Sequence, residues 1–534
     1  MEKFALLSVF YKEGIVDFAK QLVELGFTIL SSGGTARELN ENGIEARDVA
    51  TLVGGKAILG HRVVTLSREV HAGLLARYID ADIKEMETLG LPYIDLVCVD
   101  MYPLEDEVNN PDATTDSVIE KTDIGGPTML GSAAKGRRVV VCDPLDRQKV
   151  IDWLKAGKPE EKEFLTALAA KADFVVSRYR MLSAKYHGEG KYDGISGERI
   201  STCKYGENAH MIPAEVYSTG SSDPLAIDKF KRIAGTDLSY NNTCDLDRLL
   251  QTITHIAATF DVNRSKVPLI AIGVKHGNAC GASIGDDPVE VVRKMVMGDD
   301  LAIFGGLVTL NFEVNEEIAE ALLTYGMPDG KRRILDGIIA PSFVSGTAEM
   351  FERKNDKCRL VANKALAELD KNSLDTEKRL RYVRGGFLTQ PNYTFILDLN
   401  DPDLQKFGQA TAEQEDDMLL AKAICDTSNS NTITIVRNKQ SIGNGVSQHA
   451  RVRGANLAVN LTGYSKHDAK DASAASDSFF PFVDGPEVLE KAGIKAILST
   501  SGSVADNDIK EFCEKRGIIL YLIPDKKGRG FFGH

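Results

Sequence analysis

In the first part of the chain, segments with the hydrophobic pattern of buried strands alternate with segments that have the pattern of helices. Mainly apolar runs, which are typical of strands buried on both faces, occupy positions 5–10, 27–30, 93–100 and 138–142. Apolar residues at helical spacing follow them at positions 15–25, 36–42 and 146–155. Strands that alternate with helices predict an α/β fold, in which a doubly wound parallel sheet carries helices on both faces.

The pattern changes beyond this region. A mainly helical stretch at 159–187 leads into a polar, glycine-rich segment at 187–197 that is typical of a linker. We therefore expect a domain boundary near residue 195, between a first domain over 1–190 and a second region over 200–534. The second region has strand-like segments at 268–275, 334–341, 385–390, 494–498 and 518–523, and a hairpin-like pair that begins at Asn429. These segments predict a mixed α/β region.

Length, charge and cysteine usage narrow the classes of function. A chain of 534 residues exceeds one ordinary domain. Its formal net charge of -13 argues against nucleic-acid binding, which needs a basic face. The eight cysteines are scattered without a Cys-x-x-Cys motif, which fits a reducing cytoplasm. No apolar run approaches the length of a membrane span. We expect a cytoplasmic protein whose partners are neither nucleic acid nor membrane.

Two glycine-rich loops follow predicted strands of the first domain. Ser31-Ser-Gly-Gly-Thr35 lies between a strand and a helix, at the sheet edge where such folds bind ligands. Its glycines let the backbone approach a ligand closely, and the amides of a helix N-terminus favour anions. The loop is either a phosphate cradle or a tight turn without a ligand, and the pattern alone does not separate the two. The second loop, Asp123 to Leu130, precedes a helix that we expect to end near Lys135.

The pair of residues best suited to catalysis stands at the end of another apolar run. Pro268-Leu-Ile-Ala-Ile-Gly-Val is typical of a buried strand and ends in Lys275-His276, before a turn of small residues. His transfers protons near neutral pH, and Lys stabilises a developing negative charge. A surface Lys-His pair in an ordinary turn is the competing interpretation, because one short motif is weak.

Further motifs occur in order along the whole chain. They include Gly14-Ile-Val-Asp-Phe-Ala-Lys20, Val70-His-Ala-Gly73, Tyr205-Gly206, Asp336-Gly-Ile-Ile-Ala-Pro341, Ser430-Asn431 and Ser476-Asp-Ser-Phe-Phe-Pro-Phe482. Together with the loops and the Lys-His pair, these motifs resemble the bifunctional purine-biosynthesis family. That family joins aminoimidazole carboxamide ribonucleotide (AICAR) formyltransferase to inosine monophosphate (IMP) cyclohydrolase. Many matches in the family's order are far more specific than any one of them.

The resemblance implies an architecture and a set of partners. The first domain would be of the methylglyoxal-synthase type and carry the cyclohydrolase. The second region would consist of two cytidine-deaminase-like α/β subdomains that carry the formyltransferase. Zinc is not expected, because the deaminase zinc signature is absent from the sequence. The resemblance also implies a homodimer with formyltransferase sites at the subunit interface, nucleotide and folate substrates, 10-formyltetrahydrofolate as co-substrate, and room for a monovalent cation.

The formyltransferase reaction passes a formyl group to the 5-amine of AICAR, which is a poor nucleophile. A base must take its proton, and positive charge must stabilise the oxyanion or the departing folate nitrogen. By resemblance His276 is the base or proton relay, Lys275 is the electrostatic partner, and Asn431 positions the formyl group. Arg451 matches the position that faces the nucleotide or folate. The other positions that the resemblance implies for substrate binding are Lys204, Tyr205, Asn278, Phe304, Gly305, Asp336 and Phe479.

The cyclohydrolase reaction needs phosphate anchoring, a charge for the oxyanion and an acid for the loss of water. By resemblance Tyr102, Asp123 and Lys135 supply proton transfer and charge. The substrate-binding positions that the resemblance implies here are Ser8, Lys12, Ser32, Gly33, Gly34, Thr35, Arg62 and Thr65.

The first domain departs from the family's pattern. The family's Arg-Val-Lys-Thr-Leu-His reads Arg62-Val-Val-Thr-Leu-Ser67 here, so Val64 replaces a lysine and cannot stabilise an oxyanion. Near the N-terminus Phe10 removes a hydroxyl. Ring closure is intramolecular, so a reduced site can still act. The second region departs less, with Lys204 and Gly530 in place of arginines.

Three interpretations follow from this pattern. In the first, the chain is a bifunctional enzyme. In the second, it is a formyltransferase whose first domain only binds nucleotide or serves as a scaffold. In the third, it is a regulatory protein without catalysis, which would leave Lys275 and His276 idle.

Overall fold

The computed structural model describes residues 2–31, 33–55, 58–59, 63–354 and 356–533. By its internal contacts the chain divides into two compact units, Met1–Ser196 and Gly197–His534. The division falls in the glycine-rich segment of the sequence. None of the described helices is long and apolar enough to cross a membrane.

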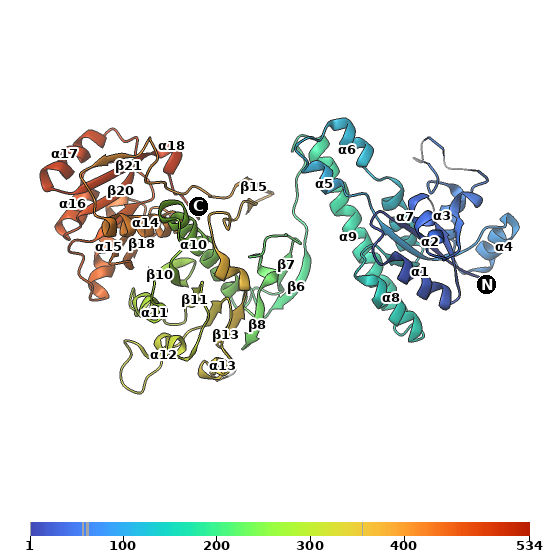
Figure 1. Cartoon of the computed structure of the whole chain (residues 1–534), viewed down its shortest axis with the longest axis horizontal. Helices are drawn as coiled ribbons and strands as arrows, with labels where there is room; N and C mark the ends of the chain where they lie inside the picture. Colours follow the sequence, from blue (N-terminus) through green and yellow to red (C-terminus); the bar gives the residue numbers. More distant parts are fainter. Residues whose placement is uncertain (1, 32, 56–57, 60–62, 355, 534) are drawn as a thin grey trace. The chain divides into compact units, whose positions relative to one another are not determined.

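The first unit is built on a five-stranded sheet in the order β3-β2-β1-β4-β5, and each neighbouring pair is parallel (Figure 1). Its strands are β1 (Lys3–Val9), β2 (Phe27–Ser31), β3 (Ala46–Asp48), β4 (Ile94–Asp100) and β5 (Val139–Val141). The predicted parallel α/β sheet is therefore confirmed. The chain moves outward in one direction from β1 and in the other from β4. Ligands of doubly wound sheets bind at such a switch, outside the carboxyl ends of the strands.

Helices cover both faces of this sheet. They are α1 (Ile15–Glu24), α2 (Gly33–Glu41), α3 (Arg68–Leu75), α4 (Asp80–Leu89), α5 (Leu104–Val108), α6 (Thr115–Lys121), α7 (Gly125–Lys135), α8 (Asp146–Lys155) and α9 (Glu161–His187). Ala5 and Leu7 are buried in a cluster with α1 and α8, whereas Phe4 and Leu6 are buried in a cluster with α3 and α7. Successive residues of β1 thus point to opposite faces that are both covered, which explains its continuous apolar run.

The second unit contains a twelve-stranded sheet and two separate two-stranded sheets. The large sheet has the order β16-β21-β20-β19-β17-β18-β10-β9-β11-β12-β13-β8. Its strands are β8 (Lys231–Ala234), β9 (Leu269–Lys275), β10 (Asn278–Gly285), β11 (Leu307–Leu310), β12 (Gly337–Ala340), β13 (Arg359–Ala362), β16 (Gln405–Phe407), β17 (Ile433–Arg437), β18 (Gln440–Gly445), β19 (Ser473–Ser476), β20 (Ala496–Ser501) and β21 (Ile519–Pro524). The small sheets pair β6 (Glu198–Cys203) with β7 (Ala214–Ser218), and β14 (Lys378–Val383) with β15 (Gly386–Pro391).

The large sheet is made of two halves with the same order of elements. The helices of the unit are α10 (Tyr240–Arg264), α11 (Pro288–Val296), α12 (Glu316–Thr324), α13 (Thr347–Met350), α14 (Ala412–Asp426), α15 (Arg451–Tyr464), α16 (Asp484–Lys491), α17 (Asp506–Arg516) and α18 (Asp525–Gly528). The first half runs β8-α10-β9-β10-α11-β11-α12-β12-α13-β13, and the second runs β16-α14-β17-β18-α15-β19-α16-β20-α17-β21. The halves join where β10 pairs antiparallel with β18, at Ser283 and Gln440.

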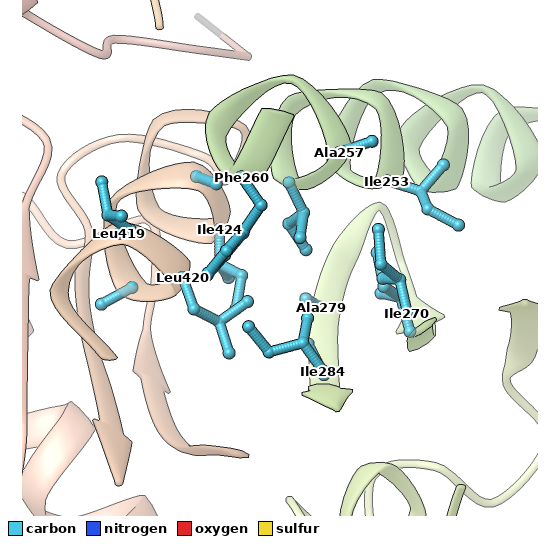
Figure 2. Packing of buried hydrophobic residues seen from close by; sticks show 14 of the residues in the cluster. Ile253, Ala257, Phe260, Ile270, Ala279, Ile284, Leu419, Leu420 and Ile424 are labelled. Atoms are coloured by element: carbon cyan, nitrogen blue, oxygen red, sulfur yellow. The ribbon is translucent and has the colours of Figure 1, made fainter. Parts of the chain in front are cut away.

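The long helices α10 and α14 belong to one buried cluster at this join (Figure 2). It contains Ile253, Ala257 and Phe260 of α10, Leu419, Leu420 and Ile424 of α14, and Ile270, Ala279 and Ile284 of the β9–β10 hairpin. Other clusters bury α11 and α12 in the first half and α15, α16 and α17 in the second. Because both halves share one core, the loops at the two sides of the join are held in fixed positions.

Candidate functional site

Lys275 and His276 stand at the tight turn of the β9–β10 hairpin. Lys275 pairs with Asn278, so the connection consists of His276 and Gly277, whose φ angles are +53° and +74°. Two positive φ values match the twist of a two-residue hairpin, and histidine is among the residues that are enriched there. The sequence led us to expect a turn of small residues after the Lys-His pair; in the structure His276 is itself a turn residue, and the small residues from Asn278 on belong to β10. A side chain on Gly281 would lie 2.2 Å from the Met295 carbonyl, so the small residues of β10 allow α11 to pack closely.

The surroundings of this turn include several predicted substrate residues. Asp245 of α10 accepts the Gly277 N–H at 2.8 Å, and burial raises the pKa of its carboxyl. Lys275 Nζ donates to the Phe304 carbonyl at 2.8 Å. The Phe304 side chain is exposed, and Gly305 follows it with a φ of +72°.

Asp336 lies close to the same turn. The Asp336 N–H donates to the Gly306 carbonyl at 2.9 Å. The negative charge of Asp336 contributes to the raised pKa of Asp245. Lys275, Phe304, Gly305 and Asp336 are thus brought together.

A segment of the second half, more than 150 residues away in sequence, completes this group. The Asn429 N–H donates to Asn278 Oδ1 at 3.0 Å across the join. Asn431, two residues on, uses both ends of its amide: Nδ2 donates to the Gln448 carbonyl at 2.8 Å, and Oδ1 accepts from Arg451 Nη2 at 2.7 Å. The amide therefore has a fixed orientation beside the hairpin turn, as a residue that positions a reacting group requires.

Arg451 itself is buried. Besides Asn431 it bonds to Ser476 Oγ at 2.8 Å and forms an ion pair with Asp477, which is fully buried. The sequence led us to expect that Arg451 faces the nucleotide or folate; in the structure its guanidinium faces these three protein groups. Phe479, two residues beyond Asp477, is half-buried.

Lys204 and Tyr205 lie in an exposed loop after β6. The Asn241 side chain of α10 donates to the Glu207 carbonyl of this loop at 3.3 Å. The loop therefore lies beside the start of the helix that carries Asp245.

In the first unit, the glycines of the Ser31–Thr35 loop lie in the first turn of α2. That helix begins at Gly33, three residues before the predicted start, and it includes Gly34 and Thr35. Thr35 Oγ1 accepts the Val9 N–H at 3.1 Å, and Lys12 Nζ donates to the same hydroxyl at 3.1 Å. Burial lowers the pKa of Lys12. An ammonium group beside the free amides of a helix N-terminus is suited to an anion such as phosphate.

Other predicted cyclohydrolase residues lie on the β4 side of the switch point between β1 and β4. Tyr102 follows β4, and its ring lies 5.7 Å from that of Phe10, which follows β1. Asp123 accepts the Gly126 N–H at 2.8 Å, its carboxyl also receives the Tyr102 backbone N–H, and burial raises its pKa. The buried Thr65 lies against the same helix start, since a Cβ on Gly125 would be 2.9 Å from its hydroxyl.

Some predicted residues of the first unit stand apart. Lys135 is exposed at the other end of α7, about 15 Å along the helix axis from Gly125 at 1.5 Å per residue. The unit does not bring Lys135 to Asp123. Ser8 is half-buried within β1, and Val64 packs against the core beneath α3 and α7. The predicted substrate residues Ser32 and Arg62 lie outside the described residues.

Sequence reasoning missed Asp245 and Asp477. The two halves offer a signal for Asp245, because an aspartate stands six residues after the helix N-cap in both. Asp245 follows Ser239, the N-cap of α10, and Asp417 follows Thr411, the N-cap of α14. No local pattern marks Asp477 as the partner of Arg451. Across the described part of the chain, no group of three His, Cys, Asp or Glu side chains is arranged to hold a metal ion.

Comparison with known proteins finds two family matches along the chain. Residues 14–128 match the model of the MGS-like domain, and residues 133–461 match that of the AICARFT/IMPCHase bienzyme. Proteins named bifunctional purine biosynthesis protein PurH are similar over 97% of this chain and 98% of their own length. The one from Bacillus cytotoxicus is 33% identical, and the one from Shouchella clausii is 35% identical.

A solved structure titled "Crystal structure of ForH" matches 36% of this chain and all of its own chain at 35% identity, with a TM-score of 0.33. The bienzyme model matches more than half of the chain, and the PurH proteins match 97% of it at more than 30% identity. This chain belongs to the AICARFT/IMPCHase bienzyme family.

Proposed function

We propose that the chain catalyses two successive steps of purine biosynthesis, the formylation of AICAR and the closure of formyl-AICAR to IMP. Membership of the family and similarity to the PurH proteins over 97% of the chain support both activities. The observation that carries the proposal is the meeting of the Lys275–His276 turn with Asn431 at the join of the two halves, through the bond between Asn429 and Asn278. The comparisons give no support to a formyltransferase with an idle first unit, although Val64 and Phe10 depart from the family's pattern in that unit.

Formyl transfer uses 10-formyltetrahydrofolate as the co-substrate, as in the family generally. The 5-amine of AICAR attacks the formyl carbon, and the bond from that carbon to folate N10 breaks. His276 takes the proton that the amine loses and passes it to the departing nitrogen. Lys275 stabilises the tetrahedral oxyanion, and Asn431 holds the formyl group in place. The monovalent cation implied by the resemblance stays a prediction.

Ring closure takes place in the first unit. The carboxamide nitrogen of formyl-AICAR attacks the formyl carbon, and water leaves. Lys12 and the start of α2 anchor the phosphate. Asp123 is the acid for water loss: its carboxyl lies at the start of α7, burial raises its pKa, and the backbone N–H of Tyr102 donates to it.

We also propose that the two halves of the second unit are cytidine-deaminase-like.

We further propose that the second unit pairs with another copy of itself. The β14–β15 sheet exposes four large apolar side chains, those of Leu380, Tyr382, Phe387 and Leu388. An isolated two-stranded sheet is marginally stable in water, so a partner surface over these side chains would stabilise it.

The test is a two-part assay on purified protein. AICAR with 10-formyltetrahydrofolate should release tetrahydrofolate, and formyl-AICAR supplied separately should give IMP faster than the uncatalysed rate. His276→Asn keeps a residue that tolerates positive φ, so it should lower formyl transfer by about 10²- to 10⁴-fold and leave ring closure unchanged. Formyl transfer that survives in His276→Asn within about twofold would contradict the assigned role.

A further inference from the structure

The two hairpin turns of the large sheet are held by equivalent helices but in different ways. In the second half, Asp417 accepts the N–H groups of both turn residues, Asn438 at 2.9 Å and Lys439 at 2.7 Å. In the first half, the equivalent Asp245 accepts only the Gly277 N–H. The first turn therefore needs another contact, and it is the turn that carries His276.

Arg248 supplies that contact. It lies three residues after Asp245, and its Nε donates to the Gly277 carbonyl at 2.9 Å. The equivalent residue three positions after Asp417 is Leu420, which is buried in the apolar cluster at the join (Figure 2). Of the two hairpin turns, only the one with the Lys-His pair is held by a guanidinium group from its helix.

The same guanidinium reaches the second half of the unit. Arg248 Nη2 donates to Asn429 Oδ1 at 2.7 Å, next to the Ser430-Asn431 pair. One side chain thus fixes the backbone beside His276 and the loop that carries Asn431. The planar fork of arginine holds two acceptors in a defined geometry, which lysine cannot do.

The C-terminal tail closes this arrangement. The Arg248 guanidinium lies 4.2 Å from the centre of the Phe532 ring, and that of Arg379 from β14 lies 4.1 Å from it. The Phe532 carbonyl accepts the Ser430 N–H at 3.2 Å. Gly533 fits beside Asn429 only because it has no side chain, since a Cβ there would lie 2.1 Å from Asn429 Oδ1.

Charge is balanced locally around the two arginines. Burial and the neighbouring Arg379 lower the pKa of Arg248 to about 10, so it stays charged at neutral pH. Asp247 faces both guanidinium groups, and burial raises its pKa. The arginines therefore serve contacts within the protein and are not a free cationic patch.

We propose that Arg248, held by the Phe532 ring, is a positioning residue for formyl transfer that locks the His276 turn and the Asn431 loop into one geometry. The inference rests on the proposed function of the second unit. In this role both side chains act through His276 and Asn431, and a displacement of about 1 Å between two catalytic groups lowers rates by up to about 10²-fold.

The test measures both activities of the full-length protein for Arg248→Met, Phe532→Leu and the double variant. We expect Arg248→Met to lower kcat of formyl transfer by about 10- to 100-fold, while KM for AICAR and the rate of ring closure stay within about threefold. Phe532→Leu should lower the same kcat. The double variant should be no worse than the more damaged single variant, because the two residues act as one unit.

The matched control is Arg264→Met. Arg264 lies on the same helix and also bridges the two halves, through Asp416 at 2.8 Å and Glu415 at 3.3 Å, but sixteen residues from Arg248. It should keep kcat within about twofold. Loss of formyl transfer in this control to the same extent would mean that any bridge between the halves suffices, and would overturn the inference.

Two further outcomes distinguish a failure of the proposed role of Arg248 from a failure of the proposed formyltransferase function. An active wild type with Arg248→Met and Phe532→Leu both within twofold of its kcat overturns the inference alone. A wild type without formyl transfer overturns the proposed function and the inference with it. Should Arg248→Met fail to fold, Phe532→Leu decides, because it changes only a ring at the end of the chain.

Discussion

The most demanding prediction concerns the buried ion pair of Arg451 and Asp477. Their side chains are 6% and 0% exposed. Arg451→Met removes the cation and leaves the carboxylate buried, a change that destabilises proteins by about 3–5 kcal/mol. Asp477 keeps one hydrogen bond, from the Thr432 N–H at 3.0 Å, so we expect the lower end of that range, about 3 kcal/mol.

The assay is urea unfolding followed by two signals. The chain has one tryptophan, Trp153, which lies in α8 of the first unit, so its fluorescence reports that unit as an internal control. Far-UV circular dichroism reports both units. With a slope of about 3 kcal/mol per molar urea, the second unit should unfold about 1 M earlier while the Trp153 transition stays in place.

A double variant separates the lost pair from lost packing. Arg451→Met with Asp477→Asn removes both charges and keeps an acceptor for the Thr432 N–H, so it should recover most of the stability. Both variants should lose formyl transfer, because Asn431 Oδ1 loses its donor, and both should keep ring closure. A loss below about 1 kcal/mol in Arg451→Met, or a double variant at least as unstable, would refute the reasoning.

Three further predictions concern other parts of the chain. Val64→Lys should raise the rate of ring closure by about tenfold or more, because its ammonium can stabilise the oxyanion while its stem replaces the packing of valine; a rate equal to that of Val64→Met would contradict this. Burial lowers the pKa of His255 to about 4, below its ordinary 6.5. The unfolded chain therefore binds a proton that the folded chain rejects, and the second unit should lose up to about 3 kcal/mol of stability from this group as the pH falls from about 6.5 to 4. That part of the pH dependence should vanish in His255→Leu, and a slope unchanged in this variant would count against the assignment. Gly530→Ala should destabilise the second unit by about 1–3 kcal/mol, because its Cβ would lie 2.0 Å from Asp426 Oδ1, whereas Gly463→Ala has open space and should not; equal thermal shifts of the two variants would contradict this.

The sequence alone determined the elements whose environment is uniform along the chain. Strands β1 and β4 are covered on both faces, so most of their residues are apolar and the run is visible without a structure. The helices α1 and α8 have one buried face, and their bounds came within a residue of the prediction. The Lys275–His276 pair was visible because it ends such a run.

Only the tertiary structure decided which distant residues meet. The pairing of β10 with β18 brings Asn278 to Asn429, and no local period encodes a contact between segments 150 residues apart. The strand β10 was not predicted because most of its residues are small and lack the apolar pattern of a strand. They are small because α11 packs closely against them. The sequence also could not show that Arg451 turns toward Asp477, or that Arg248 joins two loops. An arginine has the same local pattern on a solvated face and in a buried network, and only the partners that the fold brings together distinguish the two.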